Sequence, residues 1–397
     1  MRCSALISSV EYTSQSHFRG SYDAAVWNVH TAGRIDTTCR RKEGSKNIVL
    51  CFDGTGNEIR AKANTNVIRL FRALENTTGD QIVYYDPGVG TFSSAGASTR
   101  MGQRVSRTLG LAFGVGIKTN LAEAYTFLMN QWEPGDRIYL FGFSRGAYTA
   151  RALAGMLHVV GIPRASSENL VQYAIAKYAP RGDWTEKHSD EAQLFAELVS
   201  RAPNGSFSVP VHYLGIWDTV SAPGIFEKDH RFVKTAELPN VESGRHAVSI
   251  DERRRPYKVD LVRNKAIEEA WFTGVHSDVG GGFKDNRLAN ISLLWVLDGA
   301  RKRGILMRQK AELRGLPQRD KEYAKAKPTR MGGIWILTRG KRRAISPGTN
   351  FHSSVQFRWD DFRDGPNDPI FIDDGWCDPN PLDEASEPRD HSGHSES

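Results

Sequence analysis

Five short apolar runs recur between residues 47 and 275, and polar or glycine-rich residues follow each of them. The runs lie at residues 47–52, 81–85, 138–141, 211–217 and 271–275. They show neither a helical period nor the regular alternation of a strand with one face in water, so they are typical of strands buried on both faces of a sheet. Such strands occur in parallel sheets that helices cover on both sides.

Helical periodicity occupies much of the sequence between these runs. It is clearest at residues 67–74, 117–132 and 147–157, where apolar side chains share one helical face. Buried strands that alternate with helical patterns are typical of an α/β fold. We therefore expect one α/β domain over residues 46–360, with a mostly parallel sheet flanked by helices.

Three stretches follow neither period. Residues 222–260 are irregular and charged and contain proline, which is typical of a lid or cap over a pocket. Residues 86–116 are rich in glycine and serine, and the pattern leaves open whether they form a loop at the mouth of a site or a long connection. Beyond about residue 305 the chain is basic and irregular, and we expect no clear strand there.

The two ends of the chain predict little packed structure. Residues 1–45 are rich in Ser, Thr and Arg without a steady period, which is typical of a disordered arm or of an extension upstream of the true start. Residues 361–397 predict a flexible tail, because proline, serine and acidic residues dominate from Pro379 onward. No segment suits a secretory signal or approaches the roughly 20 apolar residues that span a bilayer. We expect a cytoplasmic protein, with secretion by a signal-independent system left open.

The composition is that of an ordinary soluble globular protein, with 39% hydrophobic and 25% charged residues. The net charge of +7 is spread along the chain, with local basic runs at residues 253–255 and 341–343. We interpret both runs as solvated faces, in preference to sites for nucleic acid or anionic lipid. The sequence therefore predicts no nucleic-acid partner, and peripheral contact with a membrane surface stays open. It predicts no particular oligomeric state.

No pattern in the sequence predicts a metal or a cofactor. The cysteines lie far apart without a CxxC or Cys/His spacing, which indicates a reducing compartment and no disulfide framework; they are Cys3, Cys39, Cys51 and Cys377. The glycine-rich turn after residue 52 lacks the third glycine of a G-x-G-x-x-G motif, because Ile59 occupies that position, and it contains no G-K-[ST]. A haloacid-dehalogenase-type phosphatase is excluded as well, because its D-x-D motif would need an acid at Cys51.

The motif Gly142-Phe-Ser-Arg-Gly146 follows the apolar run at 138–141 and precedes a helical pattern rich in alanine. The local order is therefore strand, sharp turn and helix, with Ser144 in the turn. At such a nucleophile elbow a strained backbone exposes the serine hydroxyl, and small residues two positions before and after it avoid backbone collision. A turn serine flanked by glycines is the alternative, but the flanking elements favour a nucleophile.

Asp218 and His276 each follow a further apolar run, at 211–217 and 271–275. In an open α/β sheet the carboxyl ends of the strands border one crevice, so we expect both side chains to meet Ser144 there. A serine hydroxyl needs an imidazole to take its proton and a carboxylate to hold the imidazole in the right tautomer and stabilise its cation. The chain order Ser, Asp, His is that of α/β-hydrolases. The sequence therefore predicts a triad of these three residues.

Three other residues are weaker candidates for the acid or the base of the triad. Asp278 lies too close to His276 along the chain to approach its ring easily from the outer side, and Asp251 lies in a segment without a clear strand. His352 lies beyond the last clear strand, so we prefer His276 as the base.

We expect the oxyanion hole at two backbone N–H groups beside the Ser144 hydroxyl. One is the N–H of Arg145 at the start of the helix, and the other belongs to Gly54 or Thr55 in the turn after the first strand. Asp53 is expected to support this turn by accepting hydrogen bonds from it.

Six motifs occur in order between residues 46 and 360; they are Cys51-Phe-Asp-Gly-Thr-Gly-Asn57, Tyr85-Asp-Pro-Gly-Val-Gly90, Gly142-Phe-Ser-Arg-Gly-Ala-Tyr148, Trp217-Asp-Thr-Val220, Ile250-Asp-Glu-Arg-Arg-Arg255 and Val275-His-Ser-Asp-Val-Gly-Gly-Gly282. Together they resemble the DUF2235 family, an uncharacterised α/β-hydrolase-like domain that includes the catalytic domain of one class of type VI secretion phospholipase effectors. The resemblance implies an α/β-hydrolase-like fold with a lid or cap of irregular insertions, and a triad at Ser144, Asp218 and His276. We expect no counterpart of the long membrane-targeting portion that the secreted effectors carry, so we expect a carboxylic ester hydrolase, of which a lipase or phospholipase is a special case.

The expected function is therefore serine hydrolysis of a small-molecule or lipid ester, without a cofactor. The alternative is a non-catalytic α/β-hydrolase-like scaffold that binds a partner or a membrane surface. A scaffold needs no proton acceptor opposite a serine, so the presence of candidates for all three triad roles favours the enzyme.

Overall fold

The structure is a computed structural model of the 397-residue chain, and it describes residues 44–54, 62–88, 105–180, 182–201, 206–220, 232–309, 316–330, 340–361 and 369–372, with residues 105–115, 256 and 360–361 described by their backbone alone. The expected arm at 1–45 lies almost wholly outside the described residues, and so does most of the expected tail at 361–397. The domain limits at 46 and 360 stay a prediction.

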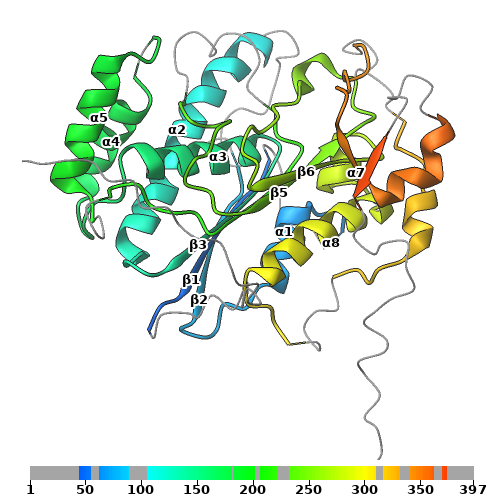
Figure 1. The fold of residues 1–397 in the computed structure, drawn as a ribbon, viewed down its shortest axis with the longest axis horizontal. Coiled ribbons are helices and arrows are strands. Elements are labelled where there is room, and N and C mark those ends of the chain that lie inside the picture. Colours follow the sequence, from blue (N-terminus) through cyan, green and yellow to red (C-terminus); the bar gives the residue numbers. More distant parts are fainter. Residues whose placement is uncertain are drawn as a thin grey trace, which may run out of the picture. The chain divides into compact units, whose positions relative to one another are not determined.

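Eight strands in the described part of the chain form one parallel sheet (Figure 1). The strands are β1 (Asn47–Phe52), β2 (Gln81–Asp86), β3 (Arg137–Phe143), β4 (Tyr213–Trp217), β5 (Gly244–Ser249), β6 (Ile267–Phe272), β7 (Asn350–His352) and β8 (Ile370–Ile372). Their order in space is β2-β1-β3-β4-β5-β6-β7-β8. The order reverses between β1 and β3, because β2 lies on one side of β1 and all later strands lie on the other. In open α/β sheets the ligand crevice lies at such a switch point, beyond the carboxyl ends of the strands.

Helices cover both faces of this sheet (Figure 1). One side carries α2 (Val105–Gln131), α3 (Arg145–Val159), α4 (Val171–Tyr178) and α5 (Glu186–Val199), and the other carries α1 (Asn66–Ala73), α7 (His276–Gly280) and α8 (Arg287–Lys302). There are also short 3₁₀ helices, η1 (Glu168–Leu170), η3 (Arg255–Tyr257), η5 (Lys321–Lys325) and η7 (Ser353–Asp361).

The two faces of β1 explain its unbroken apolar sequence. Ile48, Leu50 and Phe52 pack in the core beneath α2 and α3, whereas Val49 and Cys51 pack in the core beneath α1 and α8. Because successive side chains of a strand point to opposite faces, a strand between two cores has no polar face. This arrangement confirms the predicted α/β fold with a mostly parallel sheet flanked by helices.

Three strands were missed by the sequence interpretation. β5 lies within residues 222–260, which we expected to be irregular, and it escaped notice because it carries Arg245 and His246. His246 is buried and Arg245 is half-buried, and each contacts an acid of the neighbouring strand β6: Arg245 lies 2.9 Å from Glu268 and His246 lies 2.9 Å from Glu269. β7 and β8 lie beyond residue 305 and have three residues each, too few to give a recognisable period.

The lid expected at residues 222–260 is described only from residue 232 onward.

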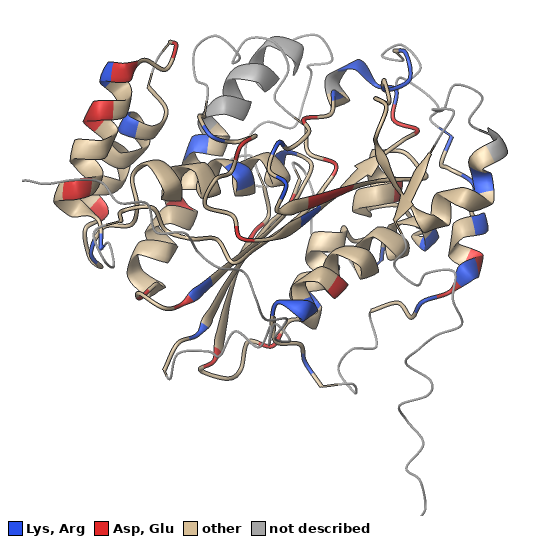
Figure 2. Ribbon diagram, viewed as in Figure 1, with Lys and Arg blue, Asp and Glu red and all other residues tan. Residues whose placement is uncertain are grey.

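Basic and acidic residues are scattered together over the helices and loops (Figure 2). Within the described residues, no helix has the length and apolar character needed to cross a bilayer.

Candidate active site

Ser144 occupies a sharp turn between β3 and α3. Its backbone has φ 60° and ψ −121°, a region that non-glycine residues rarely adopt, so the turn holds the residue under strain. The Ser144 N–H donates to Trp217 O at 3.0 Å, which ties the turn to the end of β4. A Cβ on Gly142 would lie 2.5 Å from Gly146 O, and a Cβ on Gly146 would lie 2.2 Å from Phe52 O. Glycine at these two positions therefore lets the start of α3 approach the sheet.

Gly142→Ala is expected to lower the free energy of unfolding by about 1–3 kcal/mol, because the added methyl group would collide with the rigid backbone of Gly146 and Ala147. Urea denaturation of the wild type and the variant measures the difference. Gly79→Ala is the matched control, since a Cβ there would meet nothing within 4 Å. Equal destabilisation by the two substitutions would contradict this account of the elbow glycines.

The side chains of Ser144, Asp218 and His276 lie together beyond the carboxyl ends of β3, β4 and β6. Ser144 Oγ lies 2.8 Å from His276 Nε2, and His276 Nδ1 lies 2.6 Å from Asp218 Oδ2. The three residues are 6%, 0% and 4% exposed in the order Ser144, Asp218, His276. A hydroxyl, an imidazole and a carboxylate linked in this order can activate the hydroxyl as a nucleophile.

The Asp218 carboxylate is held by several donors besides His276. Oδ1 accepts from the Ser249 N–H at 2.8 Å, and the Arg343 guanidinium donates to Oδ1 at 2.5 Å and to Oδ2 at 3.0 Å. The backbone of Asp218 has φ 40° and its N–H donates to Ala247 O at 2.7 Å. The end of β5 and Arg343 thus fix the position of the acid.

The charges of Asp218 and His276 follow from burial and from these contacts. Burial opposes ionisation of Asp218, but the nearby Arg343 charge and the His276 hydrogen bond outweigh it and hold the pKa of the carboxyl well below its usual value. Burial lowers the pKa of His276 below 6.5, and the Asp218 contact offsets this only in part. Near neutral pH an ionised carboxylate therefore accepts the Nδ1 proton, which leaves Nε2 free to accept the proton of Ser144.

The loop after β5 encloses His276. The Glu252 carboxylate is buried, accepts from the His276 N–H at 3.2 Å and pairs with Arg254 at 2.8 Å. The Tyr257 and His276 ring centroids lie 4.7 Å apart, and Arg254 stacks over Tyr257 at 3.7 Å. The loop therefore fixes both the backbone and the ring of the histidine.

The three rival residues have other partners. Asp251 accepts from the backbone of the turn after β6 at 2.8 Å. Asp278 accepts from the N–H and the hydroxyl of Thr329, at 2.9 Å and 2.6 Å. His352 stacks on Phe272 with centroids 4.5 Å apart, and it belongs to β7, so its expected place beyond the last strand is wrong.

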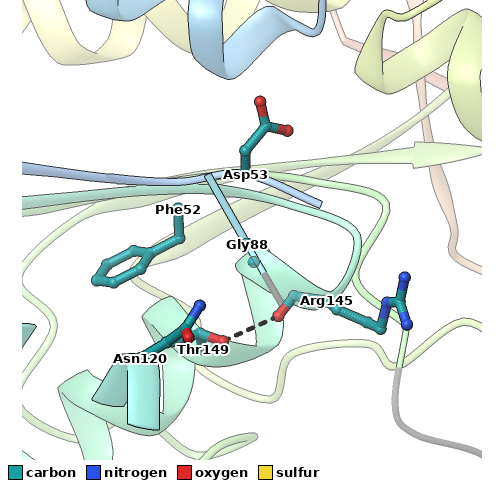
Figure 3. Close-up of a pocket in the computed structure, with 7 residues that line it drawn as sticks. Phe52, Asp53, Gly88, Asn120, Arg145 and Thr149 are labelled. Carbon is teal, nitrogen blue, oxygen red and sulfur yellow. Dashed lines mark hydrogen bonds between the residues drawn. The ribbon is translucent and has the colours of Figure 1, made fainter. Parts of the chain in front are cut away.

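Arg145, one of the expected oxyanion donors, lies where the end of β1 meets the start of α3. Figure 3 shows a small pocket at this junction; its lining residues are Phe52, Asp53, Gly88, Asn120, Arg145, Gly146 and Thr149. Asp53 points away from α3, and its carboxylate accepts from the Gly54 N–H and the Thr65 hydroxyl, both at 2.7 Å. Asp53 thus holds the start of the turn, and the Gly54 N–H is engaged by it. Arg145 begins α3 next to the serine, and Thr55 lies outside the described residues.

Sequence reasoning missed the ion pairs around these residues. Arg254 and Arg343 belong to the two basic runs interpreted as solvated faces, but their side chains are 11% and 7% exposed and pair with Glu252 and Asp218. The interpretation is wrong for these two arginines because each lies against a buried carboxylate. The acid next to the first run could have signalled a local pair. No comparable signal places Arg343 beside an acid 125 residues away in sequence.

The described residues offer no evident place for a metal ion. They contain no group of three or more His, Cys, Asp or Glu that could hold one. Cys51 is fully buried in β1, and burial raises the pKa of its thiol. Cys51 therefore acts as a packed core residue.

Comparison with known proteins places the chain among phospholipase-like domains. Residues 46–299 match the family described as the catalytic domain of T6SS phospholipase effectors of the Tle1-like type. The uncharacterised protein YEL023C of Saccharomyces cerevisiae is 38% identical over 223 residues, which are 54% of this chain and 32% of that protein. The match thus spans about a third of the length of this curated relative.

Two solved structures align with this chain at low identity. The Tle1 effector bound to the VgrG spike of the type VI secretion system is 18% identical, with a TM-score of 0.44, over 76% of this chain and 82% of that one. An uncharacterised protein from Pseudomonas aeruginosa is 19% identical, with a TM-score of 0.39, over 68% of this chain and 47% of that one.

Proposed function

Because the chain belongs to the family of Tle1-like phospholipase effector catalytic domains, we propose that it is a serine hydrolase of carboxylic esters, with lipid esters as the favoured class. In this proposal Ser144 is the nucleophile, His276 is the general base and acid, and Asp218 orients the imidazole.

The observation that supports this proposal most is the continuous hydrogen-bonded line from Ser144 Oγ through the imidazole to Asp218, at 2.8 Å and 2.6 Å. Both distances are already within the range needed for proton transfer and tautomer control. The strained backbone of Ser144 adds to this, because backbone strain often occurs at functional sites.

The proposed reaction has two halves. Ser144 Oγ attacks the ester carbonyl carbon while His276 Nε2 takes the hydroxyl proton, and Asp218 stabilises the resulting imidazolium. The imidazolium then gives that proton to the departing alcohol, which leaves an acyl group on Ser144. A water molecule then attacks the acyl carbon while His276 Nε2 takes a proton from it, and the imidazolium returns that proton to Ser144 Oγ as the acyl bond breaks and the carboxylic acid is released.

The oxyanion of each tetrahedral intermediate needs backbone donors beside Ser144. We assign one to the N–H of Arg145, because it opens α3 directly after the nucleophile and the helix N-terminus favours negative charge. The second donor is assigned to the turn after Asp53, with Thr55 preferred because the Gly54 N–H already donates to Asp53. In this assignment Asp53 holds the turn in place by accepting the Gly54 N–H.

The rate is expected to depend on pH through His276. The neutral imidazole is the competent form, so kcat/KM should rise with pH and reach half its plateau below pH 6.5, where the depressed pKa of His276 lies. A profile measured from about pH 4 to about pH 9 with an uncharged ester, which does not itself titrate, gives this midpoint. A midpoint clearly above pH 6.5 would contradict the assignment.

The experiment that tests the proposed function is a substrate panel with purified protein. It comprises short-chain carboxylic esters, a thioester, a triacylglycerol and a phospholipid, each assayed with the wild type and Ser144→Ala. We expect hydrolysis of at least one carboxylic ester by the wild type alone. Equal background rates for both proteins across the panel would favour the non-catalytic scaffold.

Membrane contact through the two basic runs has less support than the sequence suggested. Arg254 and Arg343 are engaged in internal ion pairs and cannot at the same time bind lipid phosphates. The proposed partner is therefore the ester substrate itself.

A further inference from the structure

Arg343 reaches the candidate triad from a segment that follows the family-matched residues 46–299. Its guanidinium donates to both oxygens of Asp218, at 2.5 Å and 3.0 Å. It also donates to the carbonyl and the hydroxyl of Ser249 and to the carbonyl of Tyr257, at 2.9 Å, 2.8 Å and 2.8 Å. The side chain is 7% exposed, so these contacts are largely shielded from water.

This contact changes the charge that His276 experiences. A carboxylate alone beside an imidazole stabilises the imidazolium and raises the histidine pKa. A guanidinium stays protonated at all relevant pH values, so Arg343 and Asp218 together present close to no net charge. Burial lowers the pKa of His276 most, and the Asp218 contact raises it. The Arg343 charge acts in the same direction as burial and so opposes the effect of Asp218.

The other ionisable groups around His276 leave this balance in place. They are Glu252 and Arg254 in the loop after β5, Tyr257 in η3 and Asp278 in α7. The Glu252 charge acts to raise the pKa of His276, and it pairs with Arg254 at 2.8 Å. Asp278 is held by Thr329, and burial raises its pKa. Removal of Arg343 would therefore leave one unbalanced negative charge on Asp218.

We propose that Arg343 is a positioning residue of the active site, which fixes the Asp218 carboxylate against His276 and offsets its negative charge. The proposal rests on the proposed function for its effect on rate. Its electrostatic part concerns the resting protein and holds whether or not a substrate is known.

The direct test is a titration of the His276 ring by NMR in protein with isotope-labelled histidine. The His276 signal is assigned by its loss in His276→Gln. We expect Arg343→Met to raise the His276 pKa by about one unit or more, because the Asp218 charge is no longer offset. Lys341→Met, which removes an exposed charge two positions away, should leave the pKa unchanged. An unchanged pKa in Arg343→Met would overturn the proposal.

Arg343→Lys separates charge from geometry. A lysine keeps the charge but cannot reproduce the two-pronged contact with the carboxylate. The His276 pKa should therefore stay within about 0.3 units of the wild type, while kcat falls about tenfold through loss of alignment. A purely structural role would instead lower kcat in both variants without moving the midpoint of the pH profile in either.

Arg343→Met leaves a buried carboxylate without its cation and so risks failure to fold. Arg343→Lys then carries the test, because it keeps a cation beside the Asp218 carboxylate. A kcat equal to that of the wild type in Arg343→Lys would overturn the positioning role, and a rise of its His276 pKa by about one unit would overturn the charge offset. If the wild type hydrolyses no ester, the proposed function fails, but the titration still tests the role of Arg343.

Discussion

Ester hydrolysis by Ser144→Ala is expected to fall at least about ten-thousandfold below the wild type, because the alanine methyl group cannot form the acyl intermediate. The residual rate would come from substrate binding and the oxyanion donors alone. The substitution removes a single oxygen whose hydrogen bond goes to His276, so the unfolding midpoint should change little.

Two controls separate this result from a general loss of structure. Ser277→Ala removes a serine next to His276 that has no role in the proposed reaction, and it should retain activity close to that of the wild type. Circular dichroism and urea denaturation should superimpose for the wild type, Ser144→Ala and Ser277→Ala. Loss of activity in both serine variants would indicate a structural effect instead of a missing nucleophile.

Asp218→Asn is expected to lower turnover by about ten-thousandfold, because the amide stabilises the imidazole tautomer that cannot accept the Ser144 proton. It should also lower the free energy of unfolding by about 3–5 kcal/mol, since Arg343 then remains as a buried cation without its partner. Steady-state kinetics and urea denaturation measure the two effects separately.

The double variant Asp218→Asn with Arg343→Met distinguishes the two causes. Removal of the unpaired cation should recover part of the lost stability but none of the lost turnover. Asp251→Asn is the control for the acid role, because this rival carboxylate contacts the turn after β6 and has no part in the proposed reaction. Near wild-type turnover in Asp218→Asn would move the acid role to Asp251 or Asp278.

The central strands were predictable because they are buried on both faces. The apolar run at residues 47–52 coincides with β1, since each of its side chains lies in one of two cores and none is free to be polar. β5 was not predictable in this way, because Arg245 and His246 find acid partners on β6 that are distant in sequence. Polar side chains that pair across neighbouring strands make a core strand resemble a surface loop.

Three residues of the candidate site could be placed from the sequence, and one could not. Ser144, Asp218 and His276 each follow a recognisable strand, and parallel strands bring their carboxyl ends together, so the sheet itself predicts their proximity. Their catalytic roles stay a prediction. Arg343 could not be found, because a short basic run most often faces solvent and no local pattern indicates which buried carboxylate it will meet.

The most direct test of a nucleophilic Ser144 is covalent labelling with a fluorophosphonate probe, followed by mass spectrometry of the labelled peptide. The probe reacts with a serine that an adjacent base activates and not with ordinary serines. We expect the folded wild type to be labelled on Ser144, and Ser144→Ala and heat-denatured wild type to remain unlabelled. An unlabelled wild type, or a label that persists in Ser144→Ala, would contradict the account.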